Sequence, residues 1–120
     1  MKFKWVTIKV RDLDKSLSFY KELLGIDIAM KFGSPEHQIV MLGDPQETMV
    51  ELICDSGAKD INPGNGASIG LELGDLDRLV GVLTENGYSV TGPMSPNPDM
   101  RFFFVQDPDG YTVQLVETKG

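Results

Sequence analysis

The chain opens on a regular alternation of apolar and polar residues. Residues 4–10 change character at every position, which is the period of a half-buried β-strand. One face of this predicted strand carries Val6, Ile8 and Val10, and the opposite face carries Trp5, Thr7 and Lys9. Trp5 is therefore expected to point away from the aliphatic row.

The period then changes to that of a helix. Asp12 is a favourable N-cap, and Gly25 provides a C-terminal stop. Between them the apolar positions recur at helical spacing, at Leu13, Leu17, Tyr20, Leu23 and Leu24. Strands are predicted next over 26–31, 38–42 and 48–54, with a polar loop containing His37 between the first two.

The same order of elements returns in the second half. Residues 107–115 repeat residues 44–52, which lie 63 positions earlier, and Asp75 falls at the same offset from Asp12. A strand over 68–73, a helix capped by Asp75 over 76–86, and strands over 88–90, 101–106 and 111–117 are predicted, with a proline-containing loop over 91–100.

This repeat predicts an α+β fold of two tandem β-α-β-β-β modules. Their curved mixed sheets are expected to surround a cleft, with the helices on the outer faces. The modules are predicted over 1–54 and 67–120 of one domain, 1–120, joined by a linker over 55–66 that is rich in glycine and proline.

Charge and composition narrow the function classes. A formal charge of −7 provides no basic surface for a phosphate backbone, so nucleic acid is an unexpected partner and a cationic ligand is a reasonable one. The chain shows neither an 18-residue apolar run nor a signal-peptide pattern, so we expect a cytoplasmic protein without a membrane partner. Cys54, the single cysteine, is expected to be a buried packing thiol.

Strand parity places a second set of side chains opposite the helices. This set is mixed in polarity, as the walls of small-molecule sites usually are. It consists of Trp5, Thr7, Lys9, Met49, Glu51, Ile53, Ser68, Gly70, Glu72, Thr112, Gln114 and Val116. Our predicted ligand-binding residues are Trp5, Thr7, Lys9, Met49, Glu51, Ser68, Glu72 and Gln114.

Several sequence motifs together resemble those of one known protein superfamily. The two modules, the segments Ser18-Phe19-Tyr20 and Leu24-Gly25, and the closing run of residues 107–111 resemble the vicinal oxygen chelate superfamily. That superfamily contains glyoxalase I, bleomycin-resistance proteins and extradiol dioxygenases. The resemblance covers nearly the whole chain and implies the fold rather than one function.

The resemblance also implies four metal-ligand positions, which here carry Trp5, Glu51, Ser68 and Gln114. Glu51 is an ordinary ligand and Gln114 can donate a carbonyl oxygen, but an indole has no usable lone pair and a neutral hydroxyl is a poor ligand. We therefore expect no cofactor and no metal. The alternative is a divalent metal held by Glu51 and Gln114, with Glu72 and water completing its shell.

The remaining candidates each leave two interpretations open. Glu51 is our candidate catalytic base, and Glu51 and Glu72 together favour a cation, although each could simply pair with Lys9 or water. Trp5 either packs in the cleft or stacks on a planar ligand. His37 is interpreted as a solvated loop residue, and Arg101 as a strand residue that extends its charge to solvent rather than an anion clamp.

Three functions follow. The leading one is a metal-independent small-molecule binding protein of the drug-sequestering type, with a planar, cationic ligand. The alternative is a divergent metal-dependent lyase or isomerase of the glyoxalase type, and the third is a catalytically silent interaction domain. Because the row containing Trp5 and Met49 leaves apolar area exposed, we also expect a homodimer.

Overall fold

The computed structural model describes residues 1–57 and 60–119, and these residues form two compact units, Met1–Asn62 and Pro63–Gly120. Part of the predicted linker, residues 58–59, lies outside the described residues. The assignment of modules over 1–54 and 67–120 stays a prediction.

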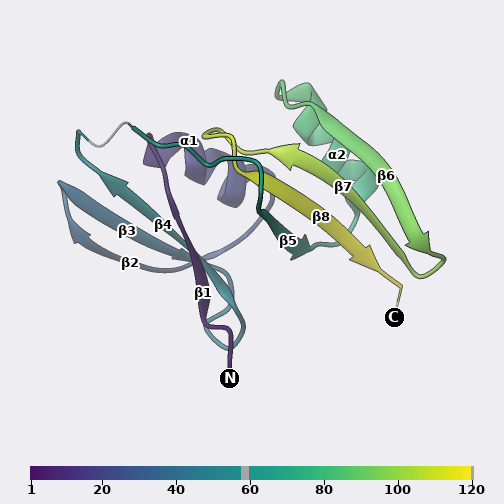
Figure 1. The fold of residues 1–120 in the computed structure, drawn as a ribbon, viewed down its shortest axis with the longest axis horizontal. Coiled ribbons are helices and arrows are strands. Elements are labelled where there is room, and N and C mark those ends of the chain that lie inside the picture. Colours follow the sequence, from purple (N-terminus) through teal and green to yellow (C-terminus); the bar gives the residue numbers. More distant parts are fainter. Residues whose placement is uncertain (58–59, 120) are drawn as a thin grey trace. The chain divides into compact units, whose positions relative to one another are not determined.

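The first unit is a four-stranded sheet with one helix (Figure 1). Its elements are β1 (Trp5–Lys9), α1 (Leu13–Leu17), the continuing helical segment η1 (Ser18–Leu23), β2 (Ile28–Ser34), β3 (His37–Leu42) and β4 (Met49–Asp55). The strand order is β1-β4-β3-β2, with β1 parallel to β4 and the other neighbours antiparallel.

The second unit repeats this arrangement (Figure 1). Its elements are β5 (Ser68–Glu72), α2 (Leu76–Glu85), β6 (Val90–Asn97), β7 (Met100–Gln106) and β8 (Thr112–Thr118). The order β5-β8-β7-β6 again has one parallel pair, β5 with β8. The predicted α+β fold of tandem modules with mixed sheets is confirmed.

The aliphatic rows form the core of each unit. In the first unit Ile8 and Leu52 are buried together with the helix residues Phe19 and Tyr20, whose rings meet edge to face at 4.8 Å. In the second unit the helical stripe and the strands bury Leu76, Leu79, Leu83, Phe103, Val105, Val113 and Leu115. Cys54 is buried as predicted.

The first helix occupies its predicted position but changes its winding. Asp12 accepts a hydrogen bond from the backbone nitrogen of Lys15 at 3.2 Å, which confirms the predicted N-cap. From Ser18 onward the helix is π-helical, and the Leu24 nitrogen donates to the Phe19 carbonyl, five residues back. Gly25 then ends it at φ 77°, as expected.

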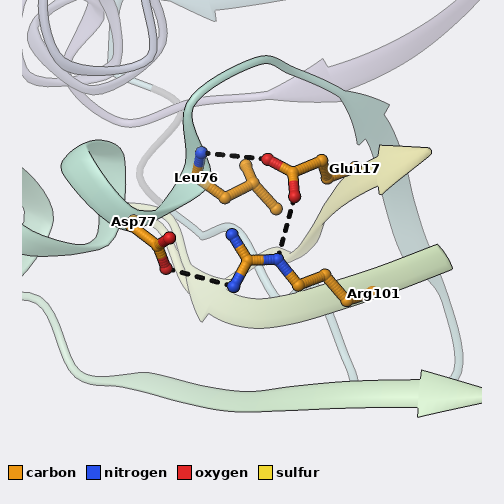
Figure 2. Close-up of polar contacts among 4 residues, drawn as sticks. All are labelled: Leu76, Asp77, Arg101 and Glu117. Atoms are coloured by element: carbon orange, nitrogen blue, oxygen red, sulfur yellow. Dashed lines mark hydrogen bonds and ion pairs between the residues drawn. The ribbon is translucent and has the colours of Figure 1, made fainter. Parts of the chain in front are cut away.

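The second helix begins in an unexpected way. The predicted N-cap Asp75 adopts a left-handed conformation, caps nothing, and instead pairs with Arg78 at 3.4 Å. Glu117 caps the helix instead, because its Oε2 accepts a hydrogen bond from the backbone nitrogen of Leu76 at 3.5 Å (Figure 2). The Asp75 cap was therefore wrong: a carboxylate distant in sequence replaces the local one.

Arg101 holds that substitute cap in place. Its Nε donates to Glu117 Oε1 at 2.9 Å, and its Nη1 donates to Asp77 Oδ1 at 3.1 Å (Figure 2). Arg101 thereby links β7 and β8 to the first turn of α2. Arg101 therefore does more than extend its charge to solvent, because two carboxylates converge on its guanidinium.

Two predicted loops are also corrected. The proline-containing segment forms most of β6, an edge strand where a missing backbone donor is tolerated. His37 is the first residue of β3 and pairs with Asp55 of β4, so it is not a solvated loop residue. No helix in the described part of the chain has the length and apolar character needed to cross a membrane.

Candidate functional site

The open face of the first sheet is the face opposite its helix, and it gathers the first group of predicted site residues. Parallel pairing sets Trp5 beside Met49, Thr7 beside Glu51 and Lys9 beside Ile53. Trp5 is 46% exposed, so its indole is available to a ligand. Strand parity thus places these side chains as the sequence pattern indicated, and their roles stay predictions.

Glu51 is held by its neighbour on this face. The Thr7 hydroxyl donates to Glu51 Oε1 at 2.6 Å, a short hydrogen bond to a charged acceptor. Lys9, two residues beyond Thr7 on β1, places its Nζ 3.1 Å from Asp55 Oδ2. The Thr7 hydroxyl therefore sets the orientation of the carboxylate at position 51.

Asp55 is a residue that the sequence reasoning missed. It was assigned to the linker, but it is the last residue of β4 and continues the row formed by Glu51 and Ile53. His37 and Lys9 both contact its carboxylate. The hydrogen bond from His37 and then the one from Lys9 lower the pKa of Asp55. Continued alternation beyond Cys54 was the signal that would have found it.

The open face of the second sheet gathers the other group. Pairing of β5 with β8 sets Ser68 beside Thr112, Gly70 beside Gln114 and Glu72 beside Val116. A side chain at Gly70 would meet Gln114, because a Cβ built there lies 3.5 Å from Oε1 of that amide. The absent side chain leaves the Gln114 carbonyl oxygen room over β5.

Aromatic rings continue this face on the next strand. Phe104 pairs with Gln114, and its ring packs edge to face against Phe102 at 5.5 Å between centroids. Gln114 is therefore bordered by aromatic surface on one side and by Gly70 on the other.

A hollow of about 530 Å³ opens at one end of the same sheet. Burial and then the charge of Asp107 raise the pKa of Tyr88, one of its lining residues. The sequence pattern did not indicate this hollow. Its lining also includes Thr91, Phe104, Gln106, Asp107 and Thr112.

The side chains at the implied metal-ligand positions suit a metal ion only in part. Among residues 1–57 and 60–119 no group of three or more His, Cys, Asp or Glu side chains is placed to hold an ion. Of the four positions implied by the resemblance, Glu51 and Gln114 each offer oxygen, whereas the Trp5 indole and the neutral Ser68 hydroxyl do not fit. Such a set lacks the imidazoles that favour zinc or nickel.

Sequence comparison identifies relatives over the full chain. The sequence model of the Glyoxalase/Bleomycin resistance protein/Dioxygenase superfamily matches residues 2–115. A probable lactoylglutathione lyase of Synechocystis sp. is 32% identical, covering 92% of this chain and 91% of the relative. The lactoylglutathione lyase of Salmonella typhimurium is 28% identical, covering 99% and 94%.

Solved structures agree with this fold. A trypanothione-dependent glyoxalase I of Leishmania major superposes with a TM-score of 0.81 at 27% identity, covering 98% of this chain and 86% of its own. An antibiotic binding protein from Streptomyces sp. CB03234 superposes with a TM-score of 0.71 at 24% identity, covering 98% and 96%, and shows likeness of fold alone.

These findings correct our leading expectation. The expectation of a metal-independent binding protein of the drug-sequestering type was wrong, because the relatives from Synechocystis sp. and Salmonella typhimurium, matched over 91% and 94% of their length, are named lactoylglutathione lyases. The expectation that no cofactor is needed likewise finds no support. Both expectations relied on the four side chains at the implied metal-ligand positions. These side chains affect how tightly a metal binds, but they do not define the reaction class. The chain belongs to the Glyoxalase/Bleomycin resistance protein/Dioxygenase superfamily.

Proposed function

We propose that this chain is a divergent glyoxalase-type lyase or isomerase that acts on a small acyl or carbonyl adduct of a thiol. The relatives named lactoylglutathione lyase support the reaction class. The observation that carries the proposal is the Glu51 carboxylate, which Thr7 orients at 2.6 Å on an open sheet face.

Glu51 is the proposed proton-transfer residue. Interconversion of an adduct of this class requires a proton to leave one carbon and return to its neighbour, and a fixed carboxylate suits both steps. The Thr7 hydrogen bond occupies Oε1 and so fixes which way Oε2 can face. Proton transfer by one positioned side chain contributes about 10²- to 10⁴-fold to a rate.

The neighbouring side chains supply binding rather than chemistry. The exposed Trp5 indole offers a stacking surface, and Met49 beside it extends the apolar contact. A planar group in the ligand therefore remains part of this proposal, and its cationic character stays a prediction. A divalent metal, when bound, would polarise a carbonyl oxygen, and Glu51 offers a carboxylate oxygen that could hold it.

The test is turnover of the hemithioacetal of methylglyoxal and glutathione, followed by the thioester absorbance, after reconstitution with Mg²⁺, Mn²⁺, Ni²⁺ or Zn²⁺. We expect Glu51→Gln to lower the rate by about 10²-fold or more. Glu85→Gln is the matched control, since Glu85 is an exposed carboxylate at the end of α2 and belongs to no predicted site. Folded wild-type protein without turnover under every metal would refute the proposal.

We also propose a homodimer. Large apolar side chains stand open on the first unit, at Trp5, Met30 and Phe32, which are 46%, 54% and 49% exposed. A second copy would bury such a surface. Light scattering at micromolar concentration tests this, and a monomer mass would contradict it.

A further inference from the structure

Three charged or titratable side chains meet near the end of the open face of the first sheet. They come from three adjacent strands, with Lys9 on β1, Asp55 on β4 and His37 on β3. Asp55 Oδ1 contacts His37 Nδ1, and Asp55 Oδ2 lies 3.1 Å from Lys9 Nζ. Strand pairing fixes the contact, because His37 and Asp55 are directly opposite in the antiparallel register.

This arrangement determines which imidazole nitrogen can accept a proton. The pKa of Asp55 is lowered, chiefly by the hydrogen bond from His37, so its carboxylate stays ionised and can only accept hydrogen bonds. Nδ1 of the neutral imidazole must then carry the hydrogen, which leaves the lone pair on Nε2. The His37 side chain is 50% exposed, so a small molecule can approach it.

We propose that His37, oriented by Asp55, is the general base of a second catalytic site that hydrolyses small activated esters and thioesters. The proposal goes beyond the lyase function. Glu51 precedes Asp55 by four strand residues, or about 13 Å at the usual rise, which is too far for both groups to share one proton. The two sites therefore act on separate atoms.

The hydrolytic step balances without any further reactant. His37 Nε2 takes a proton from water as the water oxygen bonds to the acyl carbon, and the carbonyl electron pair moves onto oxygen. The Lys9 ammonium, already beside Asp55, provides positive charge for that oxyanion. When the bond to the leaving sulfur or oxygen breaks, Nε2 returns its proton to that atom, and a carboxylic acid and a thiol or alcohol result.

The experiment measures hydrolysis of p-nitrophenyl acetate and of S-lactoylglutathione by the full chain. We expect a rate above that of free imidazole at equal concentration and at least a tenfold loss in His37→Gln. Gln38→Ala is the matched control, because Gln38 is the exposed neighbour on the other face of β3 and pairs with Cys54. It should keep the wild-type rate. His37→Gln at the wild-type rate, or wild-type protein at the imidazole rate, would overturn the proposal.

A second pair of measurements separates chemistry from folding. Added imidazole should restore hydrolysis to His37→Gly, whereas a loss that imidazole does not reverse would overturn the role of base. Asp55→Asn should lower kcat with little change in KM, because Asp55 positions the imidazole without touching substrate; a change in KM alone would contradict that. Hemithioacetal turnover in His37→Gln reports on the lyase proposal separately, so each proposal can fail without the other.

Discussion

Thr7 and Glu51 lie opposite each other on two parallel strands, and the Thr7 hydroxyl donates a hydrogen bond of 2.6 Å to Glu51 Oε1. Parallel strands distant in sequence thus give the candidate base its orientation. Thr7→Val removes the hydroxyl with little change of shape. We expect hemithioacetal turnover to fall about tenfold, which corresponds to about 1.4 kcal/mol and to the usual strength of a hydrogen bond to a charged group.

Thr7→Ser is the control, since it keeps the hydroxyl. It should retain most of the wild-type kcat/KM in the same assay. Equal losses in the valine and serine variants would show that the methyl group, rather than the hydrogen bond, matters.

The turn that occurs in both halves of the repeat predicts that equivalent substitutions at Asp107 and Asp44 change the free energy of unfolding by different amounts. Asp107 is 4% exposed, and its Oδ1 accepts from the backbone nitrogens of Asp109 and Tyr111 at 2.9 Å each. Asp44, its counterpart in the repeat, is exposed and accepts from Gln46 at 2.9 Å. We expect Asp107→Ala to cost about 1–3 kcal/mol and Asp44→Ala less than about 1 kcal/mol, because Asp107 is buried and accepts two backbone hydrogen bonds, whereas Asp44 is exposed. Urea unfolding measures both, and equal costs would contradict the argument from burial.

The cap of α2 predicts a dependence of stability on pH. The hydrogen bond from Arg101 holds the pKa of Glu117 below its ordinary value of 4.5. A depressed folded-state pKa contributes stability above that ordinary value, and the contribution is lost as pH falls through the folded-state pKa. Wild type should therefore exceed Glu117→Gln in melting temperature at pH 7, and the difference should shrink below about pH 4.5. A difference that stays constant down to pH 3 would argue against the ion pair as its cause.

Metal affinity provides a further prediction. Because the Trp5 indole and the neutral Ser68 hydroxyl are poor metal donors, the wild-type chain should bind Ni²⁺ and Zn²⁺ weakly in equilibrium dialysis. Tight stoichiometric metal in the wild-type chain would show that its own residues suffice.

Much of the fold could be read from the sequence because it depends on local periods. Alternation in residues 4–10 requires one buried face whatever the neighbours are, and the structure buries Ile8 while leaving Trp5 open. The repeat of residues 44–52 at 107–115 likewise indicated two similar units. By contrast, β6 was missed, since prolines oppose a strand in local terms and only an edge position makes one acceptable.

For the candidate site, too, the sequence determined some features and the tertiary structure decided others. Parity in the sequence alone determined which face carries Trp5, Thr7 and Glu51, because successive side chains of any strand point to opposite sides. The partners of these side chains depend on strand order and register, which bring residues together across dozens of positions. Only the tertiary structure therefore decided that Asp55 joins His37 to Lys9 and that Glu117, rather than Asp75, caps the second helix.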